Sequence, residues 1–374
     1  MGPHDRSAAA PCRGPWPARR RRYGHGAPVT VEPETPAVPI EQATATTTQR
    51  AGTRSATTWQ QLWLLLGAIV VIFFTVPDPS LAISILIFGL WAASVNLLLG
   101  YGGLVSFGHA LPFGWGGYIS GLLLLHVAPN AWLALGGSVL AMGVLAALVG
   151  AVCLRRTEVY FSMLTLAFAQ LGFFIALQWR SVTGGDDGLA GIPSPNLTLP
   201  GFTIRMSSIG DPMTFYIVTA IIVTAVFAFL ILYTDSPVGR ALQGIRESEE
   251  RARGCGYNAR AIQLLTFTVS GSVAGLAGGL FAMLNNFVGL SPYWLLSGVV
   301  LIMAILGGRG SLFGSFLGAV VFLLLEHYLS QNFASWQIIV GAVFVLCVLA
   351  FPQGLWGVLT GALGRVSQLG RARA

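Results

Sequence analysis

Few side chains in this sequence could carry out chemistry in an apolar environment, and most of them are polar but uncharged. The stretch GYGGLVSFGHALPFGWGGY (residues 100–118) contains Ser106 and His109 among seven glycines and a proline. Such a composition should break a helix. Irregular backbone at membrane depth is tolerated only where it is buried in protein or lines a cavity. We therefore predict a broken segment that either lines a substrate pathway or serves helix packing. The pathway candidates are Asn96, Ser106, His109, Gln170 and Asn285.

The composition gives no support to several other kinds of chemistry. All 21 basic residues are arginines, so the chain lacks the lysine of a Walker loop and an amine for Schiff-base chemistry. The four cysteines form no CxxC pair, and we expect neither a metal site nor a disulfide. No catalytic triad or pair of catalytic carboxylates stands out. We expect a protein that is not an enzyme and has no cofactor of its own, so that any ATP must be bound by partner subunits.

The elements that hold these polar groups are predicted to be membrane-spanning helices. Of the 374 residues, 54% are hydrophobic and only 9% are charged, whereas soluble domains carry about 25% charged residues. Between Gln61 and Leu154 the only charged residue is Asp78. We predict an all-α polytopic membrane protein with about ten transmembrane helices. The predicted spans are 61–77, 81–99, 111–127, 131–154, 159–179, 213–234, 263–288, 294–306, 315–329 and 335–352.

The positions of the arginines predict the orientation of these spans. With both termini in the cytoplasm, every arginine except Arg180 and Arg205 falls on the cytoplasmic side, as the positive-inside rule requires. Both exceptions lie in the predicted external loop, 180–212. The transmembrane permease domain would comprise residues 59–359, between a disordered basic arm (1–58) and a basic tail (360–374). The arm has no apolar region beside its arginines, so we do not expect it to be a cleavable signal peptide.

A predicted cytoplasmic segment, SPVGRALQGIRESEERARGCGYN (236–258), has the signals of one continuous helix of roughly 17 residues. Ser236 is placed to cap it and Pro237 to begin it. Glutamates and arginines four residues apart, Glu247 with Arg251 and Glu249 with Arg253, would pair along it. The segment is either a solvated hairpin or a helix that docks in the groove of a partner. A narrow stripe is expected from Val238, Ala241, Ile245, Ser248 and Ala252.

This segment resembles the cytoplasmic coupling segment of branched-chain amino-acid ABC importer permeases, in particular the LivM-type subunit. The same family pattern continues in YFSMLTLAFAQL (160–171), TGGDDGLAGIP, VSGSVAGLAGGLFA (269–282), ILGGRGSLFGSFLGA (305–319) and FPQGLWGVL (351–359). The resemblance covers roughly residues 60–359 and implies a type II ABC-importer permease in a bacterial inner (plasma) membrane. It implies that the coupling segment contacts an ATP-binding subunit. The coupling residues carried over from it are Gly239, Arg240, Ile245, Arg246, Glu247, Ser248, Glu249, Glu250 and Arg251.

The resemblance also implies the partners of the chain. These are a second related permease, two ATP-binding subunits, an extracytoplasmic solute-binding protein and membrane lipid, with no nucleic acid. Asp186 and Asp187 in the external loop are candidates for docking of the binding protein. Two alternatives stay open: the same machinery serving urea or another small amide or acid, and an ion-coupled secondary transporter.

Some glycines recur at spacings that favour close helix packing. Gly117 and Gly121 form one such pair, and Gly314 and Gly318 form another. Small residues four apart let helix backbones approach each other in lipid, so we expect these glycines to serve packing rather than to contact a substrate. A third set follows the same spacing in residues 271–279.

Overall fold

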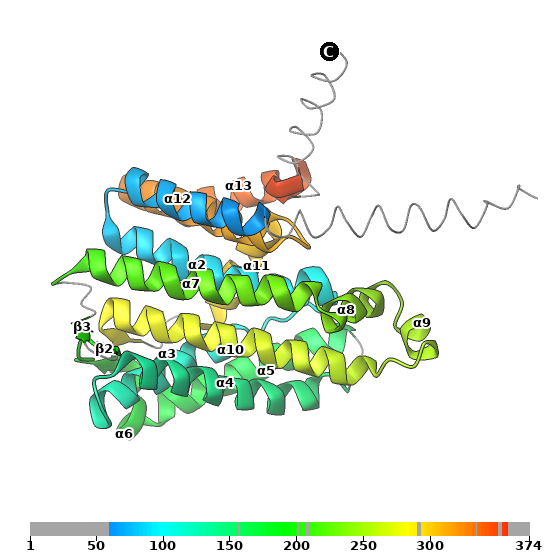
Figure 1. The fold of residues 1–374 in the computed structure, drawn as a ribbon, viewed down its shortest axis with the longest axis horizontal. Coiled ribbons are helices and arrows are strands. Elements are labelled where there is room, and N and C mark those ends of the chain that lie inside the picture. The colour runs from blue at the N-terminus through cyan, green and yellow to red at the C-terminus, as the bar shows by residue number, and fades with distance from the viewer. Residues whose placement is uncertain are drawn as a thin grey trace, which may run out of the picture. The chain divides into compact units, whose positions relative to one another are not determined.

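The computed structural model describes residues 60–155, 158–199, 202–205, 210–289, 293–333, 335–350 and 354–357. The predicted arm (1–58) and tail (360–374) lie outside these residues. The described part is a bundle of helices, in which α2, α4, α7 and α10 run side by side (Figure 1). Each of the ten predicted apolar segments overlaps a described helix, although residues 287–288 of the segment 263–288 form a short strand and residues 351–352 lie outside the described chain.

The first described helix is Gln60–Thr75. The α-helices are α2 (Pro79–Asn96), α3 (Ala110–His126), α4 (Ala131–Cys153), α5 (Glu158–Gln178), α6 (Arg180–Thr183), α7 (Pro212–Asp235), α8 (Pro237–Glu247), α9 (Glu249–Gly254), α10 (Ala259–Asn285), α11 (Tyr293–Gly307), α12 (Leu312–Asn332) and α13 (Trp336–Ala350). A π-helical turn, η1 (Leu97–Gly102), extends α2, and a 3₁₀ turn, η2 (Gly185–Asp187), follows α6. The short strands are β1 (Leu189–Ala190), β2 (Asn196–Leu199), β3 (Phe202–Arg205) and β4 (Phe287–Val288).

Six of the described helices are long and apolar enough to cross a membrane: α2 with η1, α4, α5, α7, α10 and α12. The helices Gln60–Thr75, α11 and α13 are apolar but shorter, and α3 has 17 residues. Length and composition therefore account for six crossings in the described chain. The figure of ten crossings stays a prediction, because it needs these four shorter helices as well.

Short polar side chains set where the long helices begin. Asp78, Asn130, Asp211, Asn258 and Ser311 each precede a helix and accept a hydrogen bond from a backbone N–H in its first turn. The first N–H groups of a helix have no partner inside the helix. Each such cap therefore contributes about 1 kcal/mol. These residues stand at the ends of apolar runs, so the sequence itself marks the helix boundaries.

Helix α2 forms the centre of the bundle. Of its most apolar window, 89% is buried inside the protein, against 39% for α4 and 28% for α5. Trp91 on α2 stacks on Phe113 of α3 with ring centroids 4.0 Å apart. Both α2 and α4 are apolar on every side, so their composition alone does not decide which of them is buried. Contacts with α7, α10, α11 and α12 enclose α2, whereas α4 and α5 face outward.

Glycines allow several helices to touch backbone to backbone. A Cβ on Gly278 of α10 would lie 1.8 Å from the carbonyl oxygen of Phe113, and one on Gly116 of α3 would lie 2.3 Å from that of Gly275. Between α12 and α11, a Cβ on Gly318 would lie 2.1 Å from the Met303 oxygen. The predicted packing role is thus confirmed for Gly275 and Gly318, and Gly116 and Gly278 serve the same role although the spacing did not single them out.

The loops gather at two opposite ends of the bundle. At one end β1 pairs with β4, and Asn130 forms a bridge with Asn196. The helices α8 and α9 lie at the other end (Figure 1). Segments predicted to be external therefore meet one another, far from the predicted coupling segment.

Gly278→Ala tests this packing, because the added Cβ meets a backbone atom that cannot move alone. We expect a lower midpoint of thermal unfolding in detergent, although alanine is the better helix former. The matched control is Gly136→Ala on α4, where a Cβ meets nothing within 4 Å. It should leave the midpoint unchanged or raise the stability by up to about 1 kcal/mol. Equal effects of the two substitutions would contradict the packing role.

Candidate functional site

The glycine-rich stretch is broken only in its middle. Helix α2 continues through the π-helical turn η1, and Gly103 ends that turn in the left-handed conformation with φ 72°. Regular helix resumes at Ala110, the first residue of α3. The predicted break in the stretch is therefore confirmed for residues 103–109, and the helix predicted from residue 111 begins one residue earlier. Glycines of this helix pack into α10, so residues 110–118 stay helical in spite of their composition.

Asn96 lies where α2 passes into η1, and it ties this turn to the loop between α11 and α12. Its amide nitrogen donates to the carbonyl of Ser311 at 2.8 Å and to that of Gly308 at 3.4 Å. Its amide oxygen accepts from the backbone nitrogen of Gly310 at 3.4 Å. The side chain is fully buried. In this conformation Asn96 serves a structural contact, since both ends of its amide are occupied by backbone.

His109 closes the broken segment and is buried, with 2% of its surface exposed. Its Nε2 lies 2.8 Å from the hydroxyl of Ser270 on α10. That hydroxyl donates its own hydrogen to the carbonyl of Ser94 at 2.6 Å. Ser270 must therefore accept from His109, so the hydrogen of the imidazole is on Nε2. The Nδ1 atom is buried without a hydrogen-bond partner in the described part of the chain.

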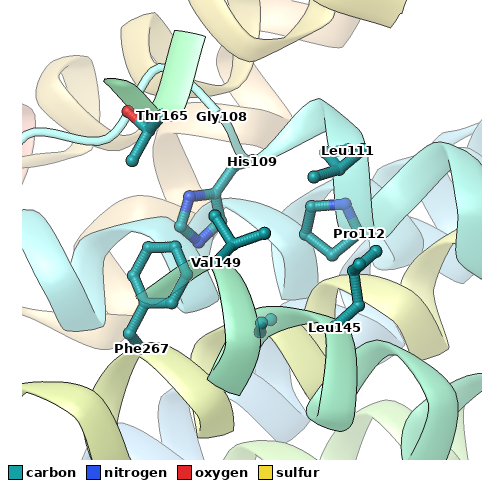
Figure 2. A pocket seen from close by; sticks show the side chains of 10 residues that line it. Gly108, His109, Leu111, Pro112, Leu145, Val149, Thr165 and Phe267 are labelled. Carbon is teal, nitrogen blue, oxygen red and sulfur yellow. The ribbon is translucent and has the colours of Figure 1, made fainter. Parts of the chain in front are cut away.

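The ring of His109 lines a small cavity together with Val149, Thr165 and Phe267 (Figure 2). The ring of Phe267 meets the imidazole edge to face, with centroids 6.2 Å apart. The cavity holds about 10 Å³, which is room for one water molecule at most. An amino acid does not fit there, so a pathway past His109 is closed in this conformation.

Hydroxyl groups from neighbouring helices hold the rest of the broken segment. Ser162 on α5 donates to the carbonyl of Val105 at 2.7 Å, and Thr165 accepts from the backbone nitrogen of Phe107 at 3.2 Å. Ser297 on α11 accepts from the nitrogen of Ala110 at 2.8 Å. The sequence analysis did not single out these side chains. The only signal for them was that Ser162, Thr165 and Ser270 lie inside family motifs, the first two in 160–171 and the third in 269–282.

The remaining pathway candidates do not meet at one point. Ser106 is buried and accepts from the backbone nitrogen of Gly108 at 3.3 Å, so it shapes the turn of its own segment. Gln170 is half-buried on α5. Asn285 is exposed at the end of α10 and donates to the carbonyl of Phe281. The structure thus brings Asn96, Ser106 and His109 to one segment and leaves Asn285 apart.

The predicted coupling helix is two helices, and the expectation of one continuous helix is wrong. Helix α8 ends at Glu247, and Ser248 has extended backbone with φ −162° and ψ 106°. The Ser248 side chain then caps α9 by accepting from the nitrogen of Arg251 at 3.3 Å. A serine inside a helical pattern competes for backbone hydrogen bonds, and here it starts a new helix. The predicted roles of Ser236 as cap and Pro237 as first residue are confirmed.

The buried face of α8 also differs from the predicted stripe. Gly239, Leu242 and Ile245 are buried, whereas Val238 and Ala241 are only half-buried. Gly239 lies against the end of α7, where a Cβ would approach the Thr234 carbonyl oxygen to 2.4 Å. These buried residues follow one another at intervals of three and form the face of α8 that packs on the bundle. Of them, only Ile245 belongs to the predicted stripe.

Arg246 points toward the bundle as well as toward solvent. Its guanidinium donates to the carbonyl of Gly100 in η1, and its side chain lies over Gly103. The π-helical turn frees backbone carbonyls from the regular ladder, and Arg246 occupies one of them. Helix α8 is thereby joined by a hydrogen bond to the broken segment.

The other predicted coupling residues remain at the surface. Glu249 and Arg253 form the ion pair described in α9, at 2.5 Å, and both side chains are largely exposed. The predicted pair of Glu247 with Arg251 is absent from the described ion pairs, because the break at Ser248 separates the two residues. The exposed members are Arg240, Glu247, Glu249, Glu250 and Arg251.

A basic cleft of about 830 Å³ lies beside these helices. It is lined by parts of η1, the end of α4, the start of α5, α8, α9, the start of α10 and the loop after α11. Loops predicted to be cytoplasmic therefore share one end of the bundle. The arginines lining the cleft are Arg155, Arg246, Arg253, Arg260 and Arg309.

Asp186 and Asp187 lie in the turn η2 at the opposite end of the bundle. Both are exposed. Gly184, Gly185 and Gly188 around them have φ between 64° and 80°, a conformation that glycine adopts without strain. The turn presents two carboxylates to solvent, and no group of three or more metal-ligating side chains occurs among the described residues.

Comparison with known proteins identifies the class to which this fold and site correspond. The model of the family described as the branched-chain amino acid transport system permease component matches residues 80–349. The chain belongs to this family, and it is a multi-pass membrane protein. No solved structure matches the chain.

Curated relatives agree with the family assignment. The high-affinity branched-chain amino acid transport system permease protein LivM of Escherichia coli K12 is 29% identical over 75% of this chain and 69% of its own length. LivM of Salmonella typhimurium is 28% identical over 80% of this chain and 76% of its own length. The LivH permease of E. coli K12 is 26% identical over 72% and 91%, respectively.

Ser270→Ala should destabilise the protein, because it leaves the buried Nε2–H of His109 and the Ser94 carbonyl without their partner. A buried unsatisfied polar group costs about 1–3 kcal/mol, which should lower the midpoint of thermal unfolding in detergent. Ser330→Ala is the control, since its exposed hydroxyl only bonds within α12. A Ser270→Ala variant as stable as Ser330→Ala would show that the His109 contact is not needed.

Proposed function

We propose that this protein is a permease subunit of an ABC importer that carries branched-chain amino acids across the inner (plasma) membrane of a bacterium. The family match over residues 80–349 carries the proposal. The chain has no lysine and hence no Walker loop of its own, so ATP is hydrolysed by partner subunits.

The partners are a second permease, two ATP-binding subunits and an extracytoplasmic solute-binding protein. Likeness to both LivM and LivH supports pairing with a related permease. The exposed charges of α8 and α9 form the contact with the ATP-binding subunit. Asp186 and Asp187, at the opposite end, pair with basic groups on the binding protein.

The hydrogen bond between Arg246 and Gly100 supports a route for coupling. An ATP-binding subunit that moves α8 also pulls on η1, because the guanidinium holds a carbonyl of that turn. Asn96 directly precedes η1 and donates a hydrogen bond to the loop after α11. Glycine contacts allow packed helices to shift as rigid bodies, so that access alternates between the two sides. His109 and Ser106 lie in the segment that moves.

This arrangement bears on only one of the two alternative functions. Transport of urea or another small amide would use the same coupling segment, so only the transported solute separates it from the main proposal. An ion-coupled secondary transporter has no use for a segment that docks an ATPase. The surface-exposed charges of α8 and α9 favour the ATP-driven machine.

Reconstitution with candidate partners in proteoliposomes tests the function. We expect leucine uptake that requires external binding protein and internal ATP, with urea taken up at background. Uptake of urea in place of leucine would replace the substrate class. Leucine uptake that follows an ion gradient without ATP would overturn the assignment to an ATP-driven importer.

Arg246→Ala should uncouple ATP hydrolysis from transport. The complex should assemble and hydrolyse ATP, but leucine uptake per ATP hydrolysed should fall at least tenfold, because α8 no longer holds Gly100. Arg309→Ala is the control, since Arg309 is exposed at the same end and has no hydrogen bond or ion pair with another described residue. Unchanged uptake per ATP would refute the route, and failure to assemble would assign Arg246 to docking instead.

A further inference from the structure

An apolar groove of about 680 Å³ runs along the outward face of α3, α4 and α5. Its polar surface is almost nil, and α4 and α5 are the least buried of the six long spans. Leu148 on α4 is 63% exposed and Leu171 on α5 is 53% exposed. No charged side chain lines the groove, so it suits an acyl chain of the bilayer. A hollow between helices would hold one such acyl chain in a defined place, unlike a smooth apolar surface.

The groove has the length of one leaflet. Along α4 its lining runs from Ala141 to Val152, and the rise of 1.5 Å per residue makes this stretch about 16 Å long. The hydrocarbon core of a bilayer is about 30 Å thick. The lining therefore reaches from the end of α4 to about the middle of the membrane, as one acyl chain does.

The end of the groove near Val152 meets the basic cleft. Leu154 and Arg155, which follow directly on α4, line that cleft, and so does Arg260 at the start of α10. The ends of these two helices adjoin, since Gly150 packs on Phe267 and Leu264. The side chains of Arg155 and Arg260 are exposed, and neither guanidinium has a hydrogen bond or ion pair with another described residue. Two guanidinium groups thus line the cleft that adjoins the Val152 end of the apolar groove.

We propose that this surface is a binding site for an anionic phospholipid of the cytoplasmic leaflet. One acyl chain lies in the groove between α3, α4 and α5, and the phosphate is bound by Arg155 and Arg260. Guanidinium groups bind phosphate through paired hydrogen bonds, and basic pockets at the cytoplasmic ends of membrane helices bind anionic headgroups. Net charge and shape together select the lipid, since a zwitterionic phospholipid brings a cationic group close to the two arginines together with its phosphate.

The site is adjacent to the broken segment. Leu111, Leu145 and Val149 line both the groove and the small cavity of His109. An acyl chain in the groove therefore packs against the outer wall of that cavity. Occupancy by lipid would support the position of α3 and α4 around His109.

Native mass spectrometry of the purified protein tests the proposal, with phosphatidylglycerol and phosphatidylcholine as probes. We expect at least fivefold more bound phosphatidylglycerol than phosphatidylcholine at equal concentration. The double variant Arg155→Gln and Arg260→Gln should lose this preference, while Arg180→Gln at the opposite end should keep it. Equal binding of the two lipids by the unaltered protein would overturn the proposal, and that comparison does not depend on the folding of any variant.

Filling the groove tests the acyl-chain half of the site. Leu148→Trp should reduce phosphatidylglycerol binding at least threefold. Leu232→Trp on α7, where the leucine is likewise 63% exposed, should leave it unchanged. Equal binding by the two variants would overturn the groove assignment. So would crosslinking from Leu148→Cys to a co-expressed permease instead of to lipid. The measurement needs neither ATP nor amino acid, so its outcome is separate from that of the transport test.

Discussion

Backbone polar groups at membrane depth need partners inside the protein, and the broken segment between η1 and α3 depends on this requirement. Regular helix supplies such partners automatically, but residues 103–109 lie outside it. Leu104 still donates to the Leu98 carbonyl of η1, and α5 supplies two further partners, Ser162 for the Val105 carbonyl and Thr165 for the Phe107 nitrogen. Hydrogen bonds from other helices lie at the ends of the segment: Arg246 of α8 bonds to Gly100, Ser270 of α10 to the imidazole of His109, and Ser297 of α11 to the nitrogen of Ala110. Because these partners lie on four different helices, the segment depends on the relative position of all four.

The close approach of the helices also follows from the lipid environment. Lipid offers no hydrophobic force to press helices together, so contact area and hydrogen bonds must do so. Gly116, Gly275 and Gly278 let α3 and α10 touch through their backbones, which brings Ser270 within reach of His109. The glycines and the hydroxyl groups therefore act together. Close packing brings the helices within hydrogen-bond distance of one another, and the hydrogen bonds between side chains fix how the helices are aligned.

The sequence predicts the helices well because apolar runs and their capping residues both mark the boundaries. Asp78, Asn130 and Ser311 stand at the start of a helix as their chemistry requires. The family could also be predicted, since its ordered motifs survive in the chain. The small-residue spacing likewise predicted close packing, although the facing partner of each glycine could not be assigned.

The parts of the site that depend on tertiary structure could not be predicted. A local pattern favoured one helix through Ser248, but the serine caps a second helix instead. Arg246 has the character of a surface residue, and only the position of η1 beneath α8 gives it a buried partner. The hydroxyls around residues 103–109 lie 57 to 187 residues away in the chain, beyond the reach of any local signal.

The π-helical turn η1 makes the fold sensitive to the number of residues between α2 and Gly103. It contains an extra residue relative to an α-helical turn, and one residue corresponds to about 100° of rotation around a helix. Removal of a residue between Leu97 and Gly102 would restore the regular ladder and draw the Gly100 carbonyl back into it. All that follows, from Gly103 to α3, would then face another direction. The hydrogen bond from Arg246 of α8 to this turn thus depends on one surplus residue, which makes the turn intolerant of deletions even at its leucine and glycine positions.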